Sequence, residues 1–286
     1  MQRLTIVHFT EYRYTSPVAL GPHRLMLRPR EGHDVRIESS KLDIRPAAQL
    51  RWHRDQFGNS VAVATFSGAT DRLVVASEVA IEHYDEAPLD FIIADHAMSY
   101  PFLYTAEERV DLLAYQQLAY PNDHDAVRAW VEGLGIGQGP IETYVLLDRM
   151  NRAMVGAFSY TRREEPGVQA PQHTLSARSG SCRDYATLFI EACRSLGLAS
   201  RFVSGYVHAP AMPAGGAATH AWAEVYLPGP GWKGFDPTTG EVTGADHIAV
   251  AVARHPESVP PIAGTFTGPV DSAPILRVDV QVRKTL

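Results

Sequence analysis

The strongest constraint on the fold is a change in the period of apolar residues along the chain. Up to about residue 90, runs such as Thr5–Tyr14, Val35–Ile44 and Leu73–Tyr84 alternate apolar and polar side chains, which is typical of strands with one buried face. Beyond Pro101, apolar residues recur at spacings of three and four, the period of an amphipathic helix. The pattern predicts an α+β protein that begins with a β-sandwich-like module over residues 1–90.

Composition excludes several classes of protein. Of 286 residues, 45% are hydrophobic and 20% charged, which suits a globular chain with a sizeable core. No apolar run approaches the roughly 18 residues of a membrane span, and the first residues lack the apolar segment of a signal peptide. A net charge of -6 argues against nucleic acid or an anionic membrane as a partner. Two cysteines exclude a disulfide scaffold and favour a cytoplasmic location; the oligomeric state stays undetermined.

Helices are predicted in the second part of the chain, residues 91–286. Thr105 is expected to cap one helix and Asp123 a shorter second helix. Ile141–Met154 carries apolar residues on one helical face, and residues 159–174 are polar enough to predict a surface loop.

The segment with the clearest chemistry is Ser179–Asp184. Ser181 followed three residues later by Asp184 fits a capping box, which would place Cys182 in the first turn of a helix. The unpaired backbone N–H groups and the positive dipole end there favour a thiolate, which is the nucleophilic form of cysteine. Gly180 would let the chain approach the helix closely because it lacks a Cβ atom.

A lone cysteine is more often a small buried core residue, and Cys193 is interpreted in that way. It lies among apolar residues in the middle of the same predicted helix. At a rise of ~1.5 Å per residue, the two cysteines would be roughly 16 Å apart, too far for a disulfide. Cys182 therefore remains the candidate nucleophile.

A β-hairpin follows the helix and carries a histidine and an aspartate. Residues 219–227 alternate strictly, with His220 and Trp222 on the polar-aromatic face. Pro228–Gly231 predicts the turn, and the returning strand ends at Asp236. Such a hairpin can bring Asp236 beside His220, although an Asp-Pro-Thr turn alone is more often structural.

Together, Cys182, His220 and Asp236 have the properties of a nucleophile, a base and a group that orients the base. Backbone N–H groups near Ser181 and Cys182 would face the oxyanion of an attacked acyl group. Tyr206, Trp222 and the loop at 209–218 are candidates for the substrate vicinity and for shielding an intermediate from water; each is equally compatible with ordinary packing.

Four segments in this order resemble the bacterial transglutaminase-like family. The segments are Gly180–Ala186, Arg194–Tyr206, His220–Tyr226 and Gly231–Thr238, with the β-rich start and the tail from His247 to Pro261 as weaker matches. The tail departs from the family where His255-Pro256 follows Arg254, which affects none of the three candidate site residues.

The resemblance implies a papain-like transglutaminase core over 91–286, made of a helical lobe and an antiparallel sheet with a β-rich tail. It also implies acyl transfer through a thioester on Cys182, with His220 as base and Asp236 as orienting residue. The expected substrate is a peptide, isopeptide or glutamine-type amide, with hydrolysis favoured over cross-linking. An amine-accepting transglutaminase and a non-catalytic binding domain are the alternatives.

Other site types find little support in the sequence. The 12 histidines are dispersed without the ligand spacing of a metal site, and no loop has the acidic pattern of a calcium site. A phosphate-binding glycine-rich loop is also missing from the sequence. We therefore expect neither a metal nor a cofactor.

Overall fold

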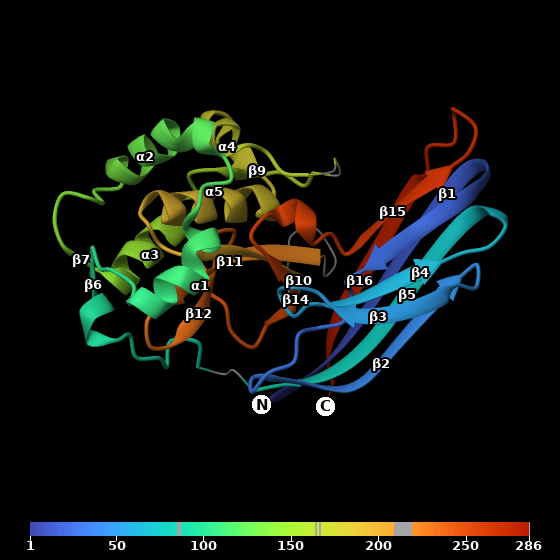
Figure 1. Cartoon of the computed structure of the whole chain (residues 1–286), viewed down its shortest axis with the longest axis horizontal. Coiled ribbons are helices and arrows are strands. Elements are labelled where there is room, and N and C mark those ends of the chain that lie inside the picture. Colours follow the sequence, from blue (N-terminus) through green and yellow to red (C-terminus); the bar gives the residue numbers. More distant parts are fainter. Residues whose placement is uncertain (85–86, 164, 166, 209–218, 286) are drawn as a thin grey trace.

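The first part of the chain forms one strongly curved sheet, shown in blue and cyan in Figure 1. The computed structural model describes residues 1–84, 87–163, 165, 167–208 and 219–285. The sheet order is β2-β5-β1-β4-β3, and a turn that contains Phe57–Asn59 joins β3 to β4. The expected α+β class with an N-terminal β module is confirmed. The strands are β1 Gln2–Leu25, β2 Val35–Arg45, β3 Gln49–Arg54, β4 Ser60–Thr65 and β5 Ala69–His83.

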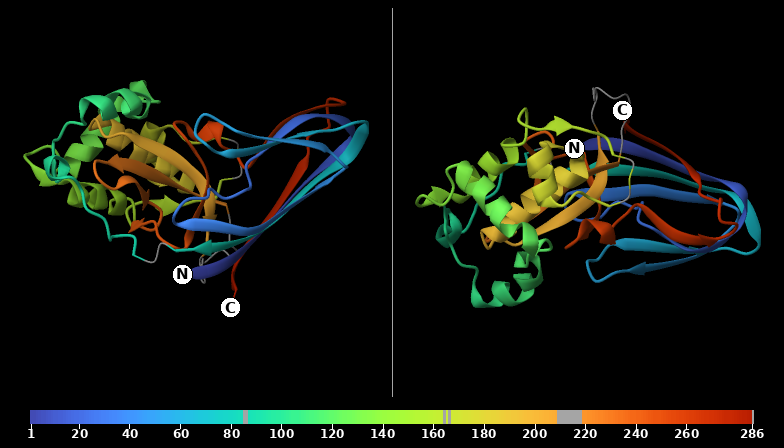
Figure 2. Two further views of the ribbon diagram at one scale, coloured as in Figure 1. Left: turned by 60° about the horizontal axis from the view of Figure 1, so that its bottom comes forward. Right: turned by 90° about the horizontal axis from the view of Figure 1, so that it is seen from above.

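The same sheet also contains strands from the end of the chain. Strand β15 (Ile262–Thr267) pairs antiparallel with the second half of β1, and β16 (Ile275–Thr285) pairs with its first half. Figure 2 shows these red strands lying along the blue β1. The sequence analysis grouped this tail with the core, because pairing between segments more than 230 residues apart leaves no mark in the local pattern.

A lobe of helices follows the first sheet. Its helices are α1 Ala106–Gln116, α2 His124–Gly133, α3 Thr143–Arg152, α4 Pro171–Ala177 and α5 Cys182–Ser195. Thr105 caps α1 as predicted, in a capping box with Glu108. Asp123 precedes α2, but its carboxylate accepts a hydrogen bond from the Gln172 backbone N–H and caps no group of α2. Among the described residues, no helix is both long and apolar enough for a membrane crossing.

Short elements connect this lobe. They are β6 Ser99–Tyr100, β7 Ile141–Glu142, β8 Ser159–Tyr160 and β9 Ser179–Gly180, with single 3-10 turns at Asp95–Ala97, Pro121–Asp123 and Pro256–Ser258. The stretch predicted as a plain loop at 159–174 therefore contains β8 and the start of α4.

The second sheet lies between the helices and the curved sheet in Figure 1. Its order is β13-β12-β11-β10-β14, and all pairs are antiparallel. The strands are β10 Ser200–Val207, β11 Thr219–Leu227, β12 Gly231–Asp236, β13 Glu241–Val242 and β14 His247–Ala253.

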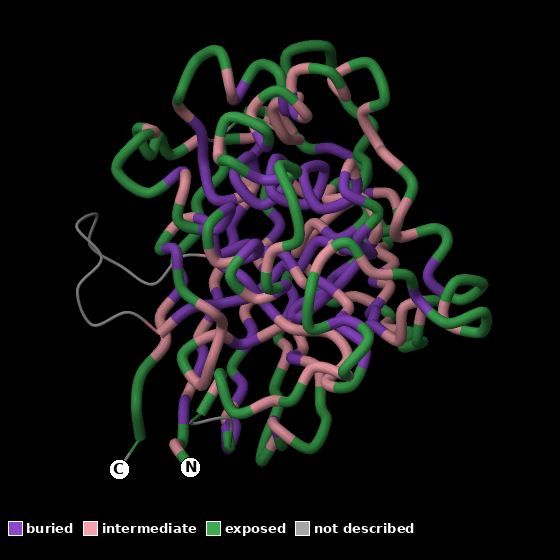
Figure 3. Tube along the Cα trace, turned by 90° about the vertical axis from the view of Figure 1, so that its left-hand side faces the viewer, coloured by how far each residue is buried: buried purple, intermediate pink, exposed green. Residues whose placement is uncertain are grey.

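Two apolar clusters fix the position of this second sheet. One face packs on α5, where Phe189 stacks on Phe235 with ring centroids 5.7 Å apart. Residues of β10 and β14 form a shared core with the curved sheet, in which Tyr206 and Ile248 meet Leu4. Burying each such side chain contributes about 1.5–3 kcal/mol, so the sheet is anchored on both sides. Figure 3 shows the buried segments gathered in the middle of the molecule.

Candidate active site

Cys182 is the first residue of α5, as the sequence predicts. Its side chain is buried, with 7% of the residue exposed. The chain reaches it through Gly180, where an added Cβ would lie 2.9 Å from the Asp184 Cβ and 3.3 Å from the Tyr185 ring. Only glycine fits this approach without a shift of its neighbours, so Gly180 allows the chain before Cys182 to pack against the first turn of α5.

A buried carboxylate holds the start of α5 in place. Asp184 Oδ2 accepts hydrogen bonds from the Ser181 backbone N–H and hydroxyl, both at 2.8 Å. Asp184 Oδ1 accepts from the Gln169 backbone N–H at 2.7 Å and from Arg163 at 2.8 Å. Burial would raise the pKa of Asp184, but these hydrogen bonds outweigh it and lower the pKa. The Ser181 hydroxyl is therefore committed to Asp184, and its role is to shape the turn before Cys182.

The hairpin brings His220 and Asp236 together. Ala223 of β11 pairs with Phe235 of β12, so Asp236 stands diagonal to His220 across the two strands. The His220 Nε2 atom lies 2.7 Å from Asp236 Oδ2, and both residues are buried. Because an ionised carboxylate only accepts, Nε2 carries the proton and donates it to Asp236.

The three residues shift one another's pKa values in the directions of an ion pair. Burial favours the neutral imidazole, but the Asp236 charge and hydrogen bonds with Asp236 and Cys182 raise the pKa of His220 to about 10. Burial likewise favours the neutral thiol, and hydrogen bonding and charge interaction with His220 overcome it and lower the pKa of Cys182. With Nε2 held by Asp236, Nδ1 is the ring nitrogen left for the thiol.

A second histidine on the same carboxylate was not predicted. His247, the first residue of β14, has its Nε2 atom 3.2 Å from Asp236 Oδ2. These two histidines and Asp236 offer ligand atoms within 4.8 Å of one another, a set that could hold a metal ion. The 2.7 Å spacing between His220 Nε2 and Asp236 Oδ2 is shorter than the roughly 3.3 Å between two ligands of a tetrahedral zinc ion. The distances from Asp236 Oδ2 to the two histidine Nε2 atoms are those of hydrogen bonds.

Tyr160 is a further residue that sequence reasoning missed. Strand β8 pairs in parallel with β9, which sets Tyr160 level with Gly180, two residues before the nucleophile. Burial, together with charge and hydrogen-bond interactions with Cys182, raises the pKa of Tyr160 to about 12. The residue is still 53% exposed, so its ring forms an open wall beside the thiol.

The other sequence candidates lie away from the thiol. The Tyr206 hydroxyl is 3.0 Å from His8 Nδ1, which places it in the core shared with the curved sheet. Trp222 is buried against Val203 and Val252, and its ring lies beside the rings of His220 and His247. Cys193 is fully buried in the core, as predicted, and burial raises its pKa. The loop at 209–218 lies outside the described residues.

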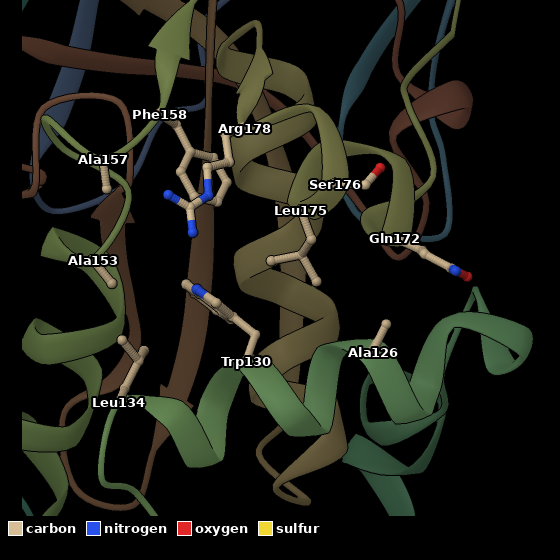
Figure 4. A pocket seen from close by; sticks show the side chains of 10 residues that line it. All are labelled: Ala126, Trp130, Leu134, Ala153, Ala157, Phe158, Gln172, Leu175, Ser176 and Arg178. Carbon is tan, nitrogen blue, oxygen red and sulfur yellow. The ribbon is translucent and has the colours of Figure 1, made fainter.

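A groove of about 510 Å³ lies between α2, α4 and the residues that follow α3, and Figure 4 shows its lining. Trp130, Leu175 and Phe158 form apolar walls, and in Figure 4 the Arg178 guanidinium lies between Phe158 and Trp130. The groove does not include the thiol. Aromatic rings connect the groove to Tyr160, since the Tyr185 ring contacts Phe158 with centroids 5.9 Å apart and Tyr160 with centroids 6.4 Å apart.

Comparison with known proteins identifies the family. Residues 4–82 match the bacterial transglutaminase-like N-terminal region, and residues 142–237 match the transglutaminase-like superfamily. The chain is 31% identical to the uncharacterized protein Rv2569c of Mycobacterium tuberculosis over 97% of its own length and 92% of that protein. It is 25% identical to the uncharacterized protein ML0607 of Mycobacterium leprae, covering 94% of each. The chain therefore belongs to the bacterial transglutaminase-like family.

A solved structure shares the whole architecture. The crystal structure described as "a Putative Cysteine Protease from Cytophaga hutchinsonii" superposes with a TM-score of 0.75 over 99% of this chain and 90% of that one. At 16% identity this likeness concerns the fold. It confirms the expected arrangement of a β-rich N-terminal region with a transglutaminase-like core.

Proposed function

We propose that the protein is a cysteine acyl-enzyme in which Cys182 is the nucleophile, His220 the acid–base group and Asp236 the residue that orients His220. The observation that carries the proposal is the buried 2.7 Å contact between His220 Nε2 and Asp236 Oδ2, on a histidine that lowers the pKa of the Cys182 thiol. A buried carboxylate paired with an imidazole beside a thiol at a helix start is the arrangement that activates cysteine for attack on a carbonyl.

The reaction follows from these positions. The Cys182 thiolate attacks the carbonyl carbon of an amide, and the oxyanion forms near the backbone N–H groups at the start of α5. As the C–N bond breaks, imidazolium His220 gives its proton to the leaving amine, which leaves an acyl-thioester on the sulfur. Water then attacks the thioester and passes a proton to His220, so the acid is released and the thiolate–imidazolium pair returns.

We favour hydrolysis over transfer to an amine because one described residue beside the buried thiol is open to water. Tyr160, next to the thiol, is 53% exposed. Tyr206, which could have formed a cover over the thioester, is buried in the core shared with the curved sheet, and Trp222 is buried against the rings of His220 and His247. An exposed thioester meets water at far higher concentration than any amine.

Two free, unpaired thiols also suit a reducing compartment, and we propose a cytoplasmic location.

The groove of Figure 4 suggests how an acyl donor is held. Its apolar walls and the nearby Arg178 guanidinium fit a peptide segment with an apolar side chain and a neighbouring carboxylate. Phe158 lines the groove, and Tyr160 lies two residues further along the same strand region, beside the thiol. We propose that the substrate extends from the groove past Tyr160 to Cys182.

Selective alkylation tests the enzyme proposal. Native protein is treated with iodoacetamide near neutral pH, and the adduct is mapped by mass spectrometry. We expect Cys182 to react much faster than a free model thiol and Cys193 to stay unmodified. If Cys182 reacts no faster than the model thiol and Cys182→Ala binds the same ligands, the non-catalytic binding domain is the better explanation.

A second experiment separates hydrolysis from transamidation. The protein is incubated with peptide and protein lysates, with and without an added primary amine, and the products are analysed by mass spectrometry. Backbone cleavage or simple deamidation supports hydrolysis. Incorporation of the amine with loss of ammonia supports the amine-accepting transglutaminase. The Cys182→Ala variant is the matched control in both arms.

A further inference from the structure

The carboxylate of Asp236 is shared by two imidazole rings. Its Oδ2 atom accepts a hydrogen bond from His220 Nε2 at 2.7 Å and one from His247 Nε2 at 3.2 Å. Its Oδ1 atom accepts from the Thr238 backbone N–H at 2.9 Å. Asp236 is fully buried, so its orientation is set by these donors and by the packing around them.

His247 is itself held from two sides. Its ring meets the Trp222 ring edge to face, with centroids 5.3 Å apart. Its backbone carbonyl accepts a hydrogen bond at 3.1 Å from Nε2 of His83, the last residue of β5 in the curved sheet. His83 is buried, with 3% of the residue exposed. A continuous series of contacts therefore runs from the N-terminal sheet through His83 and His247 to Asp236.

We propose that His247 is a positioning residue that fixes Asp236 on His220, and that the N-terminal sheet keeps His247 in place through His83. This inference rests on the proposed function, because it concerns how that site is held. It also gives the N-terminal module a role in the chemistry, since His83 of that module holds His247, which in turn holds the Asp236 carboxylate.

The charged and titratable groups around His247 define what its removal changes. Asp236 and His220 face it from β12 and β11, His83 contacts its backbone from β5, and Asp246 precedes it with His208 bound 3.1 Å from its carboxylate. Without the His247 N–H, the Asp236 carboxylate loses one of two donors on Oδ2 and can rotate away from His220. The imidazolium then loses stabilisation, and with it the Cys182 thiolate.

The test measures protonation rather than turnover. The pKa of Cys182 is taken from the rate of iodoacetamide alkylation against pH, and that of His220 from the NMR titration of its ring. In His247→Phe we expect the Cys182 value to rise and the His220 value to fall by about one pH unit each, because a hydrogen bond to a charged group is of that size. In His247→Gln, whose amide can still donate, we expect most of the wild-type values to return.

Two further variants separate a role of His247 in positioning Asp236 from a general loosening of the interface between the two sheets. His83→Leu removes the hydrogen bond to the His247 backbone carbonyl, and we expect shifts in the same direction but smaller. His8→Phe is the matched control, because His8 is a buried histidine at the same interface whose two ring nitrogens bond Tyr206 and Thr10. It is expected to lower stability and leave both pKa values unchanged.

The results distinguish this inference from the proposed function. If wild-type Cys182 shows an ordinary thiol pKa, the proposed function fails and the inference fails with it. Suppose that the wild-type thiol is activated but His247→Phe leaves the pKa values of Cys182 and His220 unchanged, or lowers the first and raises the second. Only the inference is then overturned. Equal shifts in His8→Phe would also overturn it, since they would trace the effect to a loosened interface.

Discussion

Replacing Asp236 by asparagine removes one charge from the centre of the site and keeps the side-chain shape. Asp236 is fully buried and accepts the 2.7 Å hydrogen bond from His220. Its charge is the main opponent of the burial that would otherwise keep His220 neutral. Without that charge the imidazolium is no longer favoured, and the Cys182 thiolate loses the partner that stabilises it.

The expected change in alkylation rate follows from the fraction of Cys182 that is present as thiolate. At about pH 6.5, a thiol with an ordinary pKa of about 8.5 is only roughly 1% thiolate. A wild-type thiolate that predominates at this pH would therefore react about 100-fold faster than the variant thiol. Burial of Cys182 raises the thiol pKa further once His220 no longer opposes it, which enlarges this difference. The weaker intrinsic nucleophilicity of a thiolate with a low pKa reduces it.

The assay is the rate of iodoacetamide alkylation of Cys182 at several pH values, followed by mass spectrometry. Cys193 in the same molecule serves as an internal reference, because it should remain unmodified in both proteins while they stay folded. Circular dichroism checks that the variant is folded. A rate within threefold of wild type, in a folded Asp236→Asn protein, would refute the view that the carboxylate activates the thiol.

Other changes have expected outcomes of different kinds. Because the pKa of His220 is raised from 6.5 to about 10, its ion pair contributes full stability below the unfolded value and loses it as the pH rises through about 10. The unfolding free energy lost in His220→Gln, from urea titrations, should therefore shrink between neutral and strongly alkaline pH; a loss independent of pH would contradict this. Tyr160→Phe should slow turnover about 10-fold and leave the fold intact, since one hydroxyl beside the thiol is lost; an unchanged kcat would exclude a role. Ala153→Phe fills the groove and should raise KM for peptides while Cys182 alkylation stays constant; a fall in alkylation would show that the thiol itself was disturbed. Gly180→Ala should cost about 1–3 kcal/mol in thermal or urea unfolding, because the new Cβ would press on Asp184; full stability would mean that the turn has room.

Short-range patterns in the sequence were enough to predict the main elements of the site. The capping residues fixed the start of α5, so the position of Cys182 followed from Ser181 and Asp184. Strict alternation and a Pro-Gly turn predicted the hairpin that brings His220 to Asp236. In each of these cases the residues that determine the structure are neighbours in the chain, so their pattern can be read directly.

The missed features depend on contacts between distant parts of the chain. Strand β16, at the end of the chain, pairs with β1, at its beginning. The local sequence pattern of a strand does not show which other strand it pairs with. His247 meets Asp236 only because β14 pairs with β10 at the far side of the sheet. A usable sign in the sequence was the position of His247 at the start of an otherwise apolar strand, because a polar residue there needs a hydrogen-bond partner within the protein. Tyr160 was hidden in a polar stretch that suggested a loop.

Capture of the acyl-enzyme tests the central claim most directly. The protein is mixed with a peptide library, quenched in acid within its first turnovers, digested and searched for acyl groups attached through sulfur. The account predicts a substrate-derived thioester on the peptide that contains Cys182, released by hydroxylamine and missing from the Cys182→Ala protein. Substrate turnover with no such adduct, or an equal adduct on Cys193, would contradict it.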